Sequence, residues 1–461
     1  MFNDPLLLQL ATIATWLLWL LALVLAFEVV HERRAPAATL AWVALLLLLP
    51  VLGLLLYLLF AARKVPRPAP RPCAPELPEP SCLPAAAAPA LERMLRRFGV
   101  PPATLGNALH FALTPEAARS DLLAVIDSAE RELWVLVYAF FDDASGREVM
   151  TALTAAAQRG VQVRLMVDDI GSLGDLRAAR RAFLAAGGRM VRFKPVWYAL
   201  ARRMANLRNH RKIVVADGAR AWTGGRNIGD VYLGRGDRPW LDLSLRVAGP
   251  AAAVLAEICR NDWQYGSGDT DCGAPLPVPA PSGDAVVQVL PSGPEHADDL
   301  WQAALIKACF AAQQRLWLAT PYFVPDETVL NAVLTAARSG IDVRILVPRR
   351  SDNPLVDLVA RSYLREAQRA GASVHRYEPG MMHAKFVLVD QRYALFGSAN
   401  IDARSLFLNY ESTLVAYDEA TVATLALFFD EACAQATTGL NSTGRVRETL
   451  AALARLLAPL L

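Results

Sequence analysis

Two stretches of the chain carry the same polar residues in the same order, 173 residues apart. The first reads NHRKIVVADGARAWTGGRN and the second reads MHAKFVLVDQRYALFGSAN. The shared positions are His210, Lys212, Asp217, Gly224 and Asn227 in the first and His383, Lys385, Asp390, Gly397 and Asn400 in the second. A repeated structural unit more often preserves its apolar positions. The repetition of polar residues therefore indicates one catalytic unit that is used twice.

These residue types suit the transfer of a phosphoryl group. One imidazole can attack phosphorus while the other protonates the leaving oxygen. The paired lysines and asparagines can stabilise the charge on the phosphoryl oxygens. Near each asparagine, Gly225 leaves space for an anion and Ser398 offers a hydrogen-bond donor. We therefore predict a phosphoryl pocket built from both motifs, with no metal ion and no cofactor.

This chemistry makes demands on the two histidines. One must be neutral and the other protonated, so the mechanism predicts that the pKa values of His210 and His383 are driven apart. A carboxylate that accepts a hydrogen bond from each Nδ1–H would fix the tautomer and the orientation of the ring. The candidates are Asp242 in PWLDLSL and Glu411 in LNYEST, each within a strand-like run.

The runs HRKIVVAD and HAKFVLVD have the β-branched and aromatic residues of strands. Side chains alternate between the two faces of a strand, so His210 and Lys212 should share a face, as should the second pair. Asp217 and Asp390 have the opposite parity and precede a turn. We therefore expect these aspartates to be structural, although they belong to the repeated motif.

The elements that position the motifs also recur in each half. The runs RELWVLVYAFFDD and QRLWLATPYFVPD read as strands, and a helical stretch and a second strand follow each of them. This order predicts parallel pairing through a right-handed crossover. We expect two α/β sandwich domains around mixed sheets, at residues 91–265 and 285–461, joined by a Gly/Pro-rich linker at 266–284.

The N-terminal 64 residues are different in character. Two apolar stretches, at about 6–27 and 39–62, each match the roughly 20 residues that a helix needs to cross a bilayer. We predict a transmembrane hairpin over 1–64, followed by a Pro/Ala-rich linker at 65–90. Basic residues near the span ends weakly favour both ends of the hairpin in the cytoplasm. A net charge of +3 argues against the long basic groove of a nucleic-acid-binding protein.

The repeated strings resemble the HxKxxxxD…GSxN signature of the phospholipase D superfamily. The wider chain is similar to the bacterial cardiolipin synthases, in NHRKI, GGRNIGDVYL, PSGP, TPYFVPD, GSANIDARSLFLNYE and the two N-terminal apolar stretches. The resemblance covers essentially the whole chain. In that family a glycine such as Gly225 is common where the second motif has Ser398.

The resemblance implies two phospholipase D-like domains that share one active site across a pseudo-two-fold axis. It also implies a phosphatidyl-histidine intermediate, with phosphatidylglycerol as both donor and acceptor and with cardiolipin and glycerol as products. The implied partners are phosphatidylglycerol and other anionic phospholipids. The implied location is the bacterial inner (cytoplasmic) membrane, with a multi-pass anchor and cytoplasmic catalytic domains. The implied catalytic set is His210, Lys212, Asp217, His383, Lys385 and Asp390, with Asn227, Ser398, Asn400, Gly225, Asp242 and Glu411 in support.

Several alternatives stay open at this point. A membrane-anchored phospholipase D hydrolase or a phosphatidylserine synthase would differ only in the acceptor, which a catalytic signature does not reveal. A protein of another class, an inactive membrane scaffold, would be free to lose a histidine or lysine, yet both motifs are intact. The sequence also leaves open which histidine attacks, with a weak preference for His210. It does not decide whether the chain acts alone or as a homo-oligomer.

Overall fold

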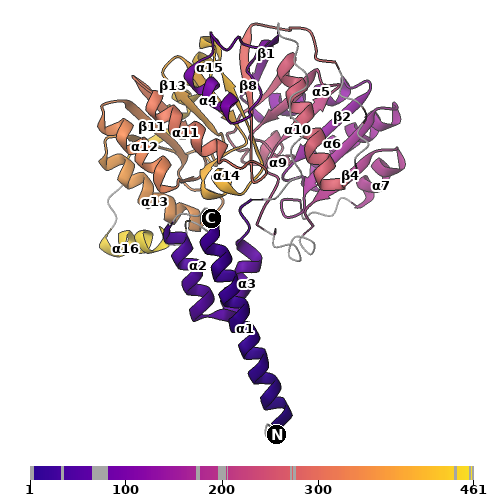
Figure 1. Cartoon of the computed structure of the whole chain (residues 1–461). Coiled ribbons are helices and arrows are strands. Elements are labelled where there is room, and N and C mark those ends of the chain that lie inside the picture. Colours follow the sequence, from indigo (N-terminus) through magenta and orange to yellow (C-terminus); the bar gives the residue numbers. More distant parts are fainter. Residues whose placement is uncertain are drawn as a thin grey trace. The chain divides into compact units, whose positions relative to one another are not determined.

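The computed structural model describes residues 5–32, 36–64, 81–172, 177–195, 204, 206–269, 273, 277–440, 444–455 and 458. The chain divides into two compact units (Figure 1). The first unit comprises residues 1–63 and 194–207, and the second comprises residues 64–193 and 208–461.

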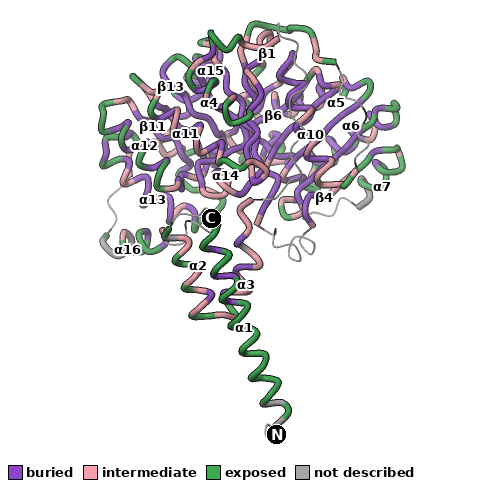
Figure 2. Tube along the Cα trace, viewed as in Figure 1, coloured by how far each residue is buried: buried purple, intermediate pink, exposed green. Residues whose placement is uncertain are grey.

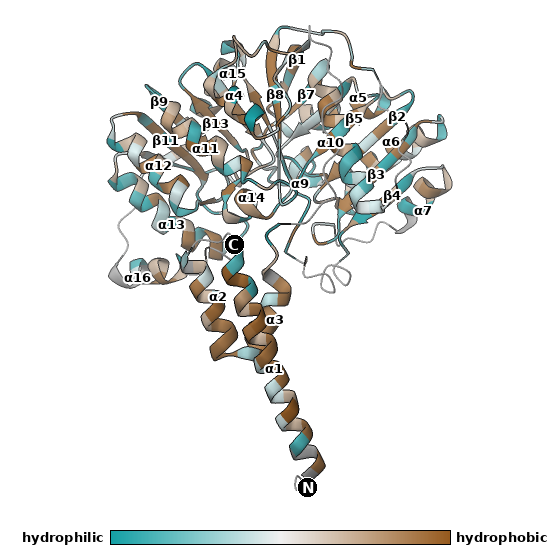
Figure 3. Cartoon of the chain, in the orientation of Figure 1, coloured by the Kyte–Doolittle hydropathy of each residue, from teal (hydrophilic) through white to brown (hydrophobic). Residues whose placement is uncertain are grey.

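The first unit is built from the apolar helices α1 (Pro5–His31), α2 (Pro36–Leu48) and α3 (Pro50–Phe60). Among the described helices, α1 alone is long and apolar enough to cross a bilayer, over Gln9–His31. Much of its apolar surface is exposed, including Trp16 at 72% and Phe27 at 68% (Figures 2 and 3). Burial of that surface in lipid would remove it from water.

The second predicted span, over about 39–62, is not one helix. Proline has no amide hydrogen, and the chain breaks at Leu49–Pro50 into α2 and α3. The ring centroids of Trp42 and Tyr57 are 5.8 Å apart, whereas a continuous helix would separate these residues by about 22 Å. A Cβ on Gly53 would lie 2.7 Å from the carbonyl oxygen of Leu45. The two short helices therefore fold back against each other, and the stretch 39–62 is not the single continuous helix that we predicted.

The second unit contains a fifteen-stranded sheet, counted within its described residues. The strands run in the order β17-β12-β11-β9-β13-β14-β16-β8-β1-β7-β6-β5-β2-β3-β4. Those of the first half are β1 (Thr104–Ala112), β2 (Glu132–Val137), β3 (Gln162–Asp168), β4 (Arg189–Phe193), β5 (Ile213–Ala216), β6 (Arg220–Gly224) and β7 (Ser244–Ala248). Those of the second half are β8 (Ala285–Ser292), β9 (Arg315–Ala319), β11 (Asp342–Pro348), β12 (Ser373–Tyr377), β13 (Phe386–Val389), β14 (Tyr393–Gly397), β16 (Glu411–Ala416) and β17 (Ala436–Thr438). A separate pair is formed by β10 (Phe323–Val324) and β15 (Ile401–Asp402).

The strand order reads the same outward from the central β8–β1 pair, apart from the extra edge strand β17. Thus β7-β6-β5-β2-β3-β4 in the first half matches β16-β14-β13-β9-β11-β12 in the second. In both halves the crossover strands are parallel and the motif hairpins are antiparallel. The prediction of two α/β sandwich domains related by a pseudo-two-fold axis is confirmed. The two sheets are continuous because β1 pairs with β8.

Helices cover both faces of this sheet. Trp134 and Leu136 of β2 point into one core, and Leu133, Val135 and Val137 point into another. The first of these cores is shared by both halves and includes α10 and α15. The helices are α4 (Ala90–Arg97), α5 (Pro115–Asp127), α6 (Ala144–Gln158), α7 (Arg177–Ala185), α9 (Asp230–Leu233), α10 (Pro250–Ser267), α11 (Leu300–Ala311), α12 (Glu327–Arg338), α13 (Pro354–Arg369), α14 (Ala403–Phe407), α15 (Glu419–Ala434) and α16 (Arg445–Ala454).

The predicted linkers are only partly described. Residues 65–80 lie outside the described residues, whereas Leu83 donates a backbone hydrogen bond to Ala103 and so joins the second unit. Helix α10 extends to Ser267, and Ser282 donates to the carbonyl of Gly106 in β1. The described parts of both linkers thus run along the domains that they connect.

Candidate active site

The two motif histidines precede strands β5 and β13 rather than lying within them. The strands begin at Ile213 and Phe386, three residues after each histidine. Each histidine is held by the backbone of the opposite half. The amide of His210 donates to the carbonyl of Tyr410 at 2.9 Å, and that of His383 donates to Leu241 at 2.6 Å. These crossed bonds bring the two motifs together.

Each histidine side chain also contacts the opposite half. Nδ1 of His210 lies 3.0 Å from Oε1 of Glu411, which begins β16 in the second half. Nδ1 of His383 lies 2.6 Å from Oδ2 of Asp242, which belongs to the first half. If each Nδ1–H donates to its carboxylate, Nε2 is the nitrogen left for chemistry on phosphorus. The structure therefore brings together both candidate carboxylates and both histidines, and exchanges the carboxylates between the halves.

The residue types at positions 225 and 398 fit the carboxylates that lie next to them. Oγ of Ser398 donates to Oε2 of Glu411 at 2.5 Å. At the equivalent place, a Cβ on Gly225 would lie 2.2 Å from Oδ1 of Asp242. The shorter aspartate sits against the backbone and leaves no space for a side chain. These two positions thus support the carboxylates and are not part of the cavity lining.

Both histidines line one cavity of about 380 Å³ in the second unit. Tyr138 packs edge-on to His210, with ring centroids 4.8 Å apart. The rings of Trp240 and Tyr232 flank that of His383, with centroid distances of 5.2 and 5.5 Å. The lining consists of Tyr138, Arg208, His210, Asn227, Tyr232, Tyr322, Val324, Asp352, Asn353, Val356, His383, Asn400, Asp402, Arg404 and Asn409. The cavity is therefore polar and walled by aromatic rings.

The motif lysines lie directly behind the histidines. Nζ of Lys212 donates to the carbonyl of His210 at 2.7 Å. Nζ of Lys385 donates to the carbonyl of His383 and lies 2.9 Å from its Nδ1. Burial lowers the pKa of Lys212 to about 7 and that of Lys385 to about 8, against the pull of nearby carboxylates. The charge on these lysines therefore depends on pH close to neutrality.

The pKa values of the two histidines are not driven apart in the ligand-free protein. Burial lowers the pKa of His210 to about 4, although Glu411 opposes the shift. Burial and then Lys385 lower the pKa of His383 to about 3. Both imidazoles are therefore neutral at pH 7, and the predicted difference between them is absent. An anionic phosphodiester between the rings would raise both pKa values and allow one ring to take a proton.

The two carboxylates stay ionised in spite of their burial. Burial alone would raise the pKa of Glu411, but His210 and Lys212 outweigh it and lower the pKa. Burial would likewise raise the pKa of Asp242, but Lys385 and His383 outweigh it and lower this pKa. Glu411 also accepts from the hydroxyl of Ser405 at 2.8 Å.

The two motif asparagines both line the cavity. Oδ1 of Asn227 accepts from the amide of Ala139 at 3.2 Å. Nδ2 of Asn400 donates to Oδ2 of Asp402 at 3.0 Å. Each amide is therefore held at one end by the protein while the side chain faces the cavity.

Asp217 and Asp390 lie elsewhere, at the far turns of the β5–β6 and β13–β14 hairpins. Both have positive φ, at +54° and +52°. The carboxylate of Asp217 accepts from the amides of residues 130, 131 and 132 at 2.8 to 2.9 Å. That of Asp390 accepts from the amides of residues 313, 314 and 315. The structural role expected from parity fits these contacts, and the place of the two aspartates in the catalytic set stays a prediction.

Several cavity residues escaped the sequence interpretation. Tyr138 and Tyr322 follow β2 and β9 at the start of YAFFDD and YFVPD, so the repeat itself contained the signal. Arg208 and Arg404 add guanidinium groups to the lining. Within the described part of the chain, no group of three His, Cys, Asp or Glu side chains is placed to hold a metal ion.

A duplicated α/β sandwich with a His–Lys motif from each half in one cavity defines a protein of the phospholipase D superfamily. A family model described as "Cardiolipin synthase, PLD-like domain" matches residues 122–237 and 305–433. A second, described as "Phospholipase D-nuclease N-terminal", matches residues 15–61. The chain belongs to the cardiolipin synthase family.

Curated relatives are similar over most of their length. Cardiolipin synthase 1 of Bacillus anthracis is 35% identical, with 90% of this chain and 86% of the relative covered. Cardiolipin synthase A of Pseudomonas entomophila is 32% identical, with 96% and 97% covered. Among solved structures, the phosphatidylserine synthase of Haemophilus influenzae Rd KW20 is 16% identical. It covers 81% of this chain and 100% of its own, with a TM-score of 0.62, and so shares the fold.

Proposed function

We propose that this protein is a cardiolipin synthase that transfers a phosphatidyl group from one phosphatidylglycerol to another. The pair of imidazoles in one cavity carries the proposal, because each Nδ1 faces a buried carboxylate of the opposite half. This arrangement suits transfer in two steps through a covalent intermediate. The similarity to cardiolipin synthases supports a phospholipid hydroxyl as acceptor.

In the first step, Nε2 of His210 attacks phosphorus and the bond from phosphorus to the headgroup oxygen breaks. His383 donates a proton to that oxygen, and glycerol leaves. In the second step, His383 takes the proton from the headgroup hydroxyl of a second phosphatidylglycerol. That oxygen attacks phosphorus, the P–N bond breaks, and cardiolipin and free His210 result. We assign the attack to His210 because its side chain is 12% exposed, against 5% for His383.

The test is to incubate detergent-solubilised protein with labelled phosphatidylglycerol and to separate the lipid products. Wild type should give cardiolipin and an equal amount of glycerol, and His210→Ala and His383→Ala should give no cardiolipin. A His383→Ala variant that accumulates labelled protein would support attack by His210. Phosphatidic acid as the main product would instead make water the acceptor. Phosphatidylserine formed only when serine is added would make the protein a phosphatidylserine synthase, and no turnover at all would favour an inactive scaffold.

The first unit suits a membrane anchor with one span. Helix α1 is long enough to cross the bilayer, whereas α2 and α3 would reach only about 20 and 16 Å into a hydrocarbon core of about 30 Å. We therefore propose that α2 and α3 enter the membrane and return to the same side. In this arrangement Arg33 and Arg34, which follow α1, lie on the same side as Arg63 and Lys64, which follow α3. The positive-inside rule then places that side, and the catalytic unit, in the cytoplasm.

This topology differs from a two-span hairpin in the position of the N-terminus. Epitope tags at the two ends of the chain would show the difference in spheroplasts of a bacterial host. With one span and a returning hairpin, external protease should remove the N-terminal tag and leave the C-terminal tag. Protection of both tags until the membrane is permeabilised would support the two-span hairpin instead.

A further inference from the structure

A second cavity of about 690 Å³ lies in the second half of the catalytic unit. Its walls come from the carboxyl ends of the parallel strands β11 and β12, from the segment after β9, and from α13. In open α/β sheets, ligands commonly bind at the carboxyl ends of parallel strands. The first turn of α13 separates the two cavities, since Asn353 and Val356 line the catalytic one and Pro354 and Asp357 line the other.

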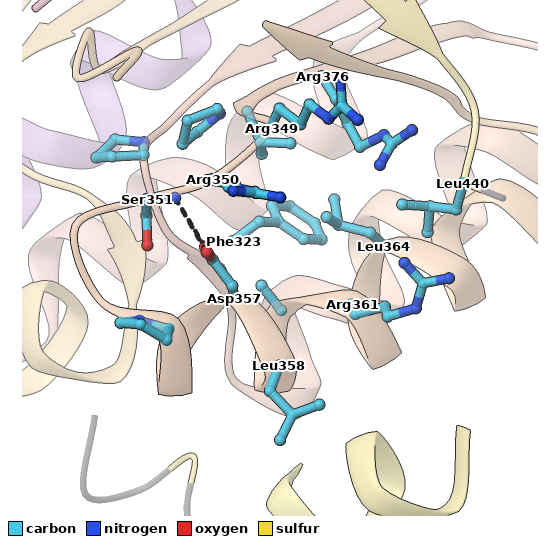
Figure 4. Close-up of a pocket in the computed structure, with 15 residues that line it drawn as sticks. Phe323, Arg349, Arg350, Ser351, Asp357, Leu358, Arg361, Leu364, Arg376 and Leu440 are labelled. Atoms are coloured by element: carbon cyan, nitrogen blue, oxygen red, sulfur yellow. Dashed lines mark hydrogen bonds between the residues drawn. The ribbon is translucent and has the colours of Figure 1, made fainter. Parts of the chain in front are cut away.

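The lining of the second cavity is strongly cationic. Four guanidinium groups line it, from Arg349, Arg350, Arg361 and Arg376, and one carboxylate, from Asp357. The guanidinium group of Arg349 is paired with Glu378. The carboxylate of Asp357 accepts hydrogen bonds from the amide of Ser351 at 3.0 and 3.1 Å (Figure 4). A phosphate group suits such a lining, because arginine forms charge-assisted hydrogen bonds with it.

The same cavity also has an apolar side. Figure 4 shows the guanidinium groups around the side chains of Phe323 and Leu364, with Leu358 and Leu440 nearby. Phe323 and Leu364 are buried in the hydrophobic core, whereas Leu358 and Leu440 are only partly buried and offer apolar surface to the cavity. A molecule that joins a phosphate to a hydrocarbon chain would contact both sides of the cavity.

The first half of the molecule provides an internal comparison. The register pairs Val167 with Arg192 in the first half and Val347 with Arg376 in the second. Two residues beyond each valine stand Asp169 and Arg349. Asp169 pairs with Arg192 at 2.8 Å, so that strand end is neutralised. In the second half, Arg349 stands in place of this carboxylate and pairs with Glu378, so that Arg376 has no carboxylate at the position equivalent to Asp169.

We infer that this cavity binds the phosphate of an anionic phospholipid, with its acyl portion along Leu358 and Leu440. The inference rests on the proposed function, since the ligand is of the same class as the proposed substrate. The site is distinct from the catalytic cavity, so a lipid bound there is held next to the reaction without taking part in it. Its volume admits a headgroup with the first part of the chains rather than a whole phospholipid.

The test is photolabelling of the detergent-solubilised full chain with phosphatidylglycerol that carries a diazirine on an acyl chain. Labelled peptides are mapped by mass spectrometry. Wild type should be labelled within 355–364 or at Leu440, and the same probe with a phosphatidylcholine headgroup should label this site much less. Arg350→Glu should reduce labelling about tenfold, since a charge-assisted contact is replaced by repulsion. Arg369→Glu, at the other end of α13, is the matched control and should label as wild type does.

Three results would overturn the inference: no labelling of the cavity in wild type, equal labelling in Arg350→Glu, or equal labelling by the phosphatidylcholine probe. Suppression of labelling by inorganic phosphate or glycerol phosphate, but not by unlabelled phosphatidylglycerol, would also overturn it and assign the cavity to a small phosphorylated molecule. Arg350 is exposed, so its replacement leaves the core intact. Labelling needs no turnover, and failure of the cardiolipin assay would therefore leave this test readable.

Discussion

Nδ1 of His383 and Oδ2 of Asp242 lie 2.6 Å apart although the two residues come from opposite halves of a duplicated domain. His210 and Glu411 repeat this relationship in the other direction. Neither motif histidine therefore takes its orienting carboxylate from its own half. The duplication is thus required for the site itself.

The first prediction concerns these carboxylates. In Asp242→Asn, the neutral amide no longer offers a charged acceptor to Nδ1–H of His383. The tautomer and the orientation of that ring are therefore lost. We expect the turnover number to fall by about 10³ to 10⁴, with Glu411→Gln acting similarly through His210. The measurement is single-turnover transfer from labelled phosphatidylglycerol. Asp237→Asn, in the exposed loop before Trp240, is the control, and equal rates in Asp237→Asn and Asp242→Asn would contradict the prediction.

The second prediction concerns the glycine next to Asp242. In Gly225→Ala, the new Cβ would lie 2.2 Å from Oδ1 of Asp242 and would push the carboxylate away from His383. We expect a loss of turnover of about a hundredfold. Gly380→Ala is the control, since a Cβ there meets nothing within 4 Å. Retained activity in Gly225→Ala would mean that this close approach is not needed.

The third prediction concerns the matching position in the second half. Ser398→Ala removes the hydroxyl that donates to Glu411 at 2.5 Å, but Glu411 keeps the bond from Ser405. The expected loss is therefore smaller, about tenfold. It should appear in the turnover number rather than in the apparent affinity for lipid, because Ser398 does not line the cavity.

Much of this site could be predicted from the sequence, because a duplicated motif can be compared with itself. The repeat identified the histidines, lysines and asparagines, and strand-like runs pointed to Asp242 and Glu411. Parity along the strand separated Asp217 and Asp390 from the histidines. The exchange of carboxylates between halves could not be predicted, because it depends on how the β8–β1 pair joins the two sheets.

Other features depend on packing that a pattern does not record. The apolar run 39–62 has the composition of a span, but Pro50 breaks it and Trp42 packs on Tyr57. The pKa values of the histidines depend on their burial in the folded protein, which lowers both values. The cationic cavity beside α13 brings together residues from several separate elements.

The fourth prediction concerns the motif aspartates. Asp217→Ala removes a carboxylate that accepts from three backbone amides and places alanine at a φ of +54°. We expect a loss of stability of about 2 to 4 kcal/mol, with activity per folded molecule largely retained. Asp217→Asn should be milder, since asparagine tolerates positive φ and keeps an acceptor. A large loss of activity at an unchanged unfolding midpoint would instead point to a catalytic role.

The fifth prediction is a loss of stability in mild acid. Both histidines have an ordinary pKa of about 6.5 when unfolded, but values of about 4 and about 3 in the folded protein. Between these values the unfolded chain binds more protons, so the free energy of unfolding rises with pH and is lost as the pH falls below 6.5. Two such groups give a slope of up to about 3 kcal/mol per pH unit.

The fifth prediction is measured by urea unfolding of the solubilised protein between about pH 5 and 7. The carboxylates Asp242 and Glu411 contribute little there, because their ordinary pKa values are 3.8 and 4.5 and the folded values are lower. In the double variant His210→Gln/His383→Gln, the slope of the free energy of unfolding against pH should fall by the contribution of about two protons. A wild-type slope equal to that of the double variant would mean that the histidines are already protonated in the folded protein. His383 could then donate a proton without help from the substrate, but His210 would have to lose its proton before its Nε2 could attack phosphorus.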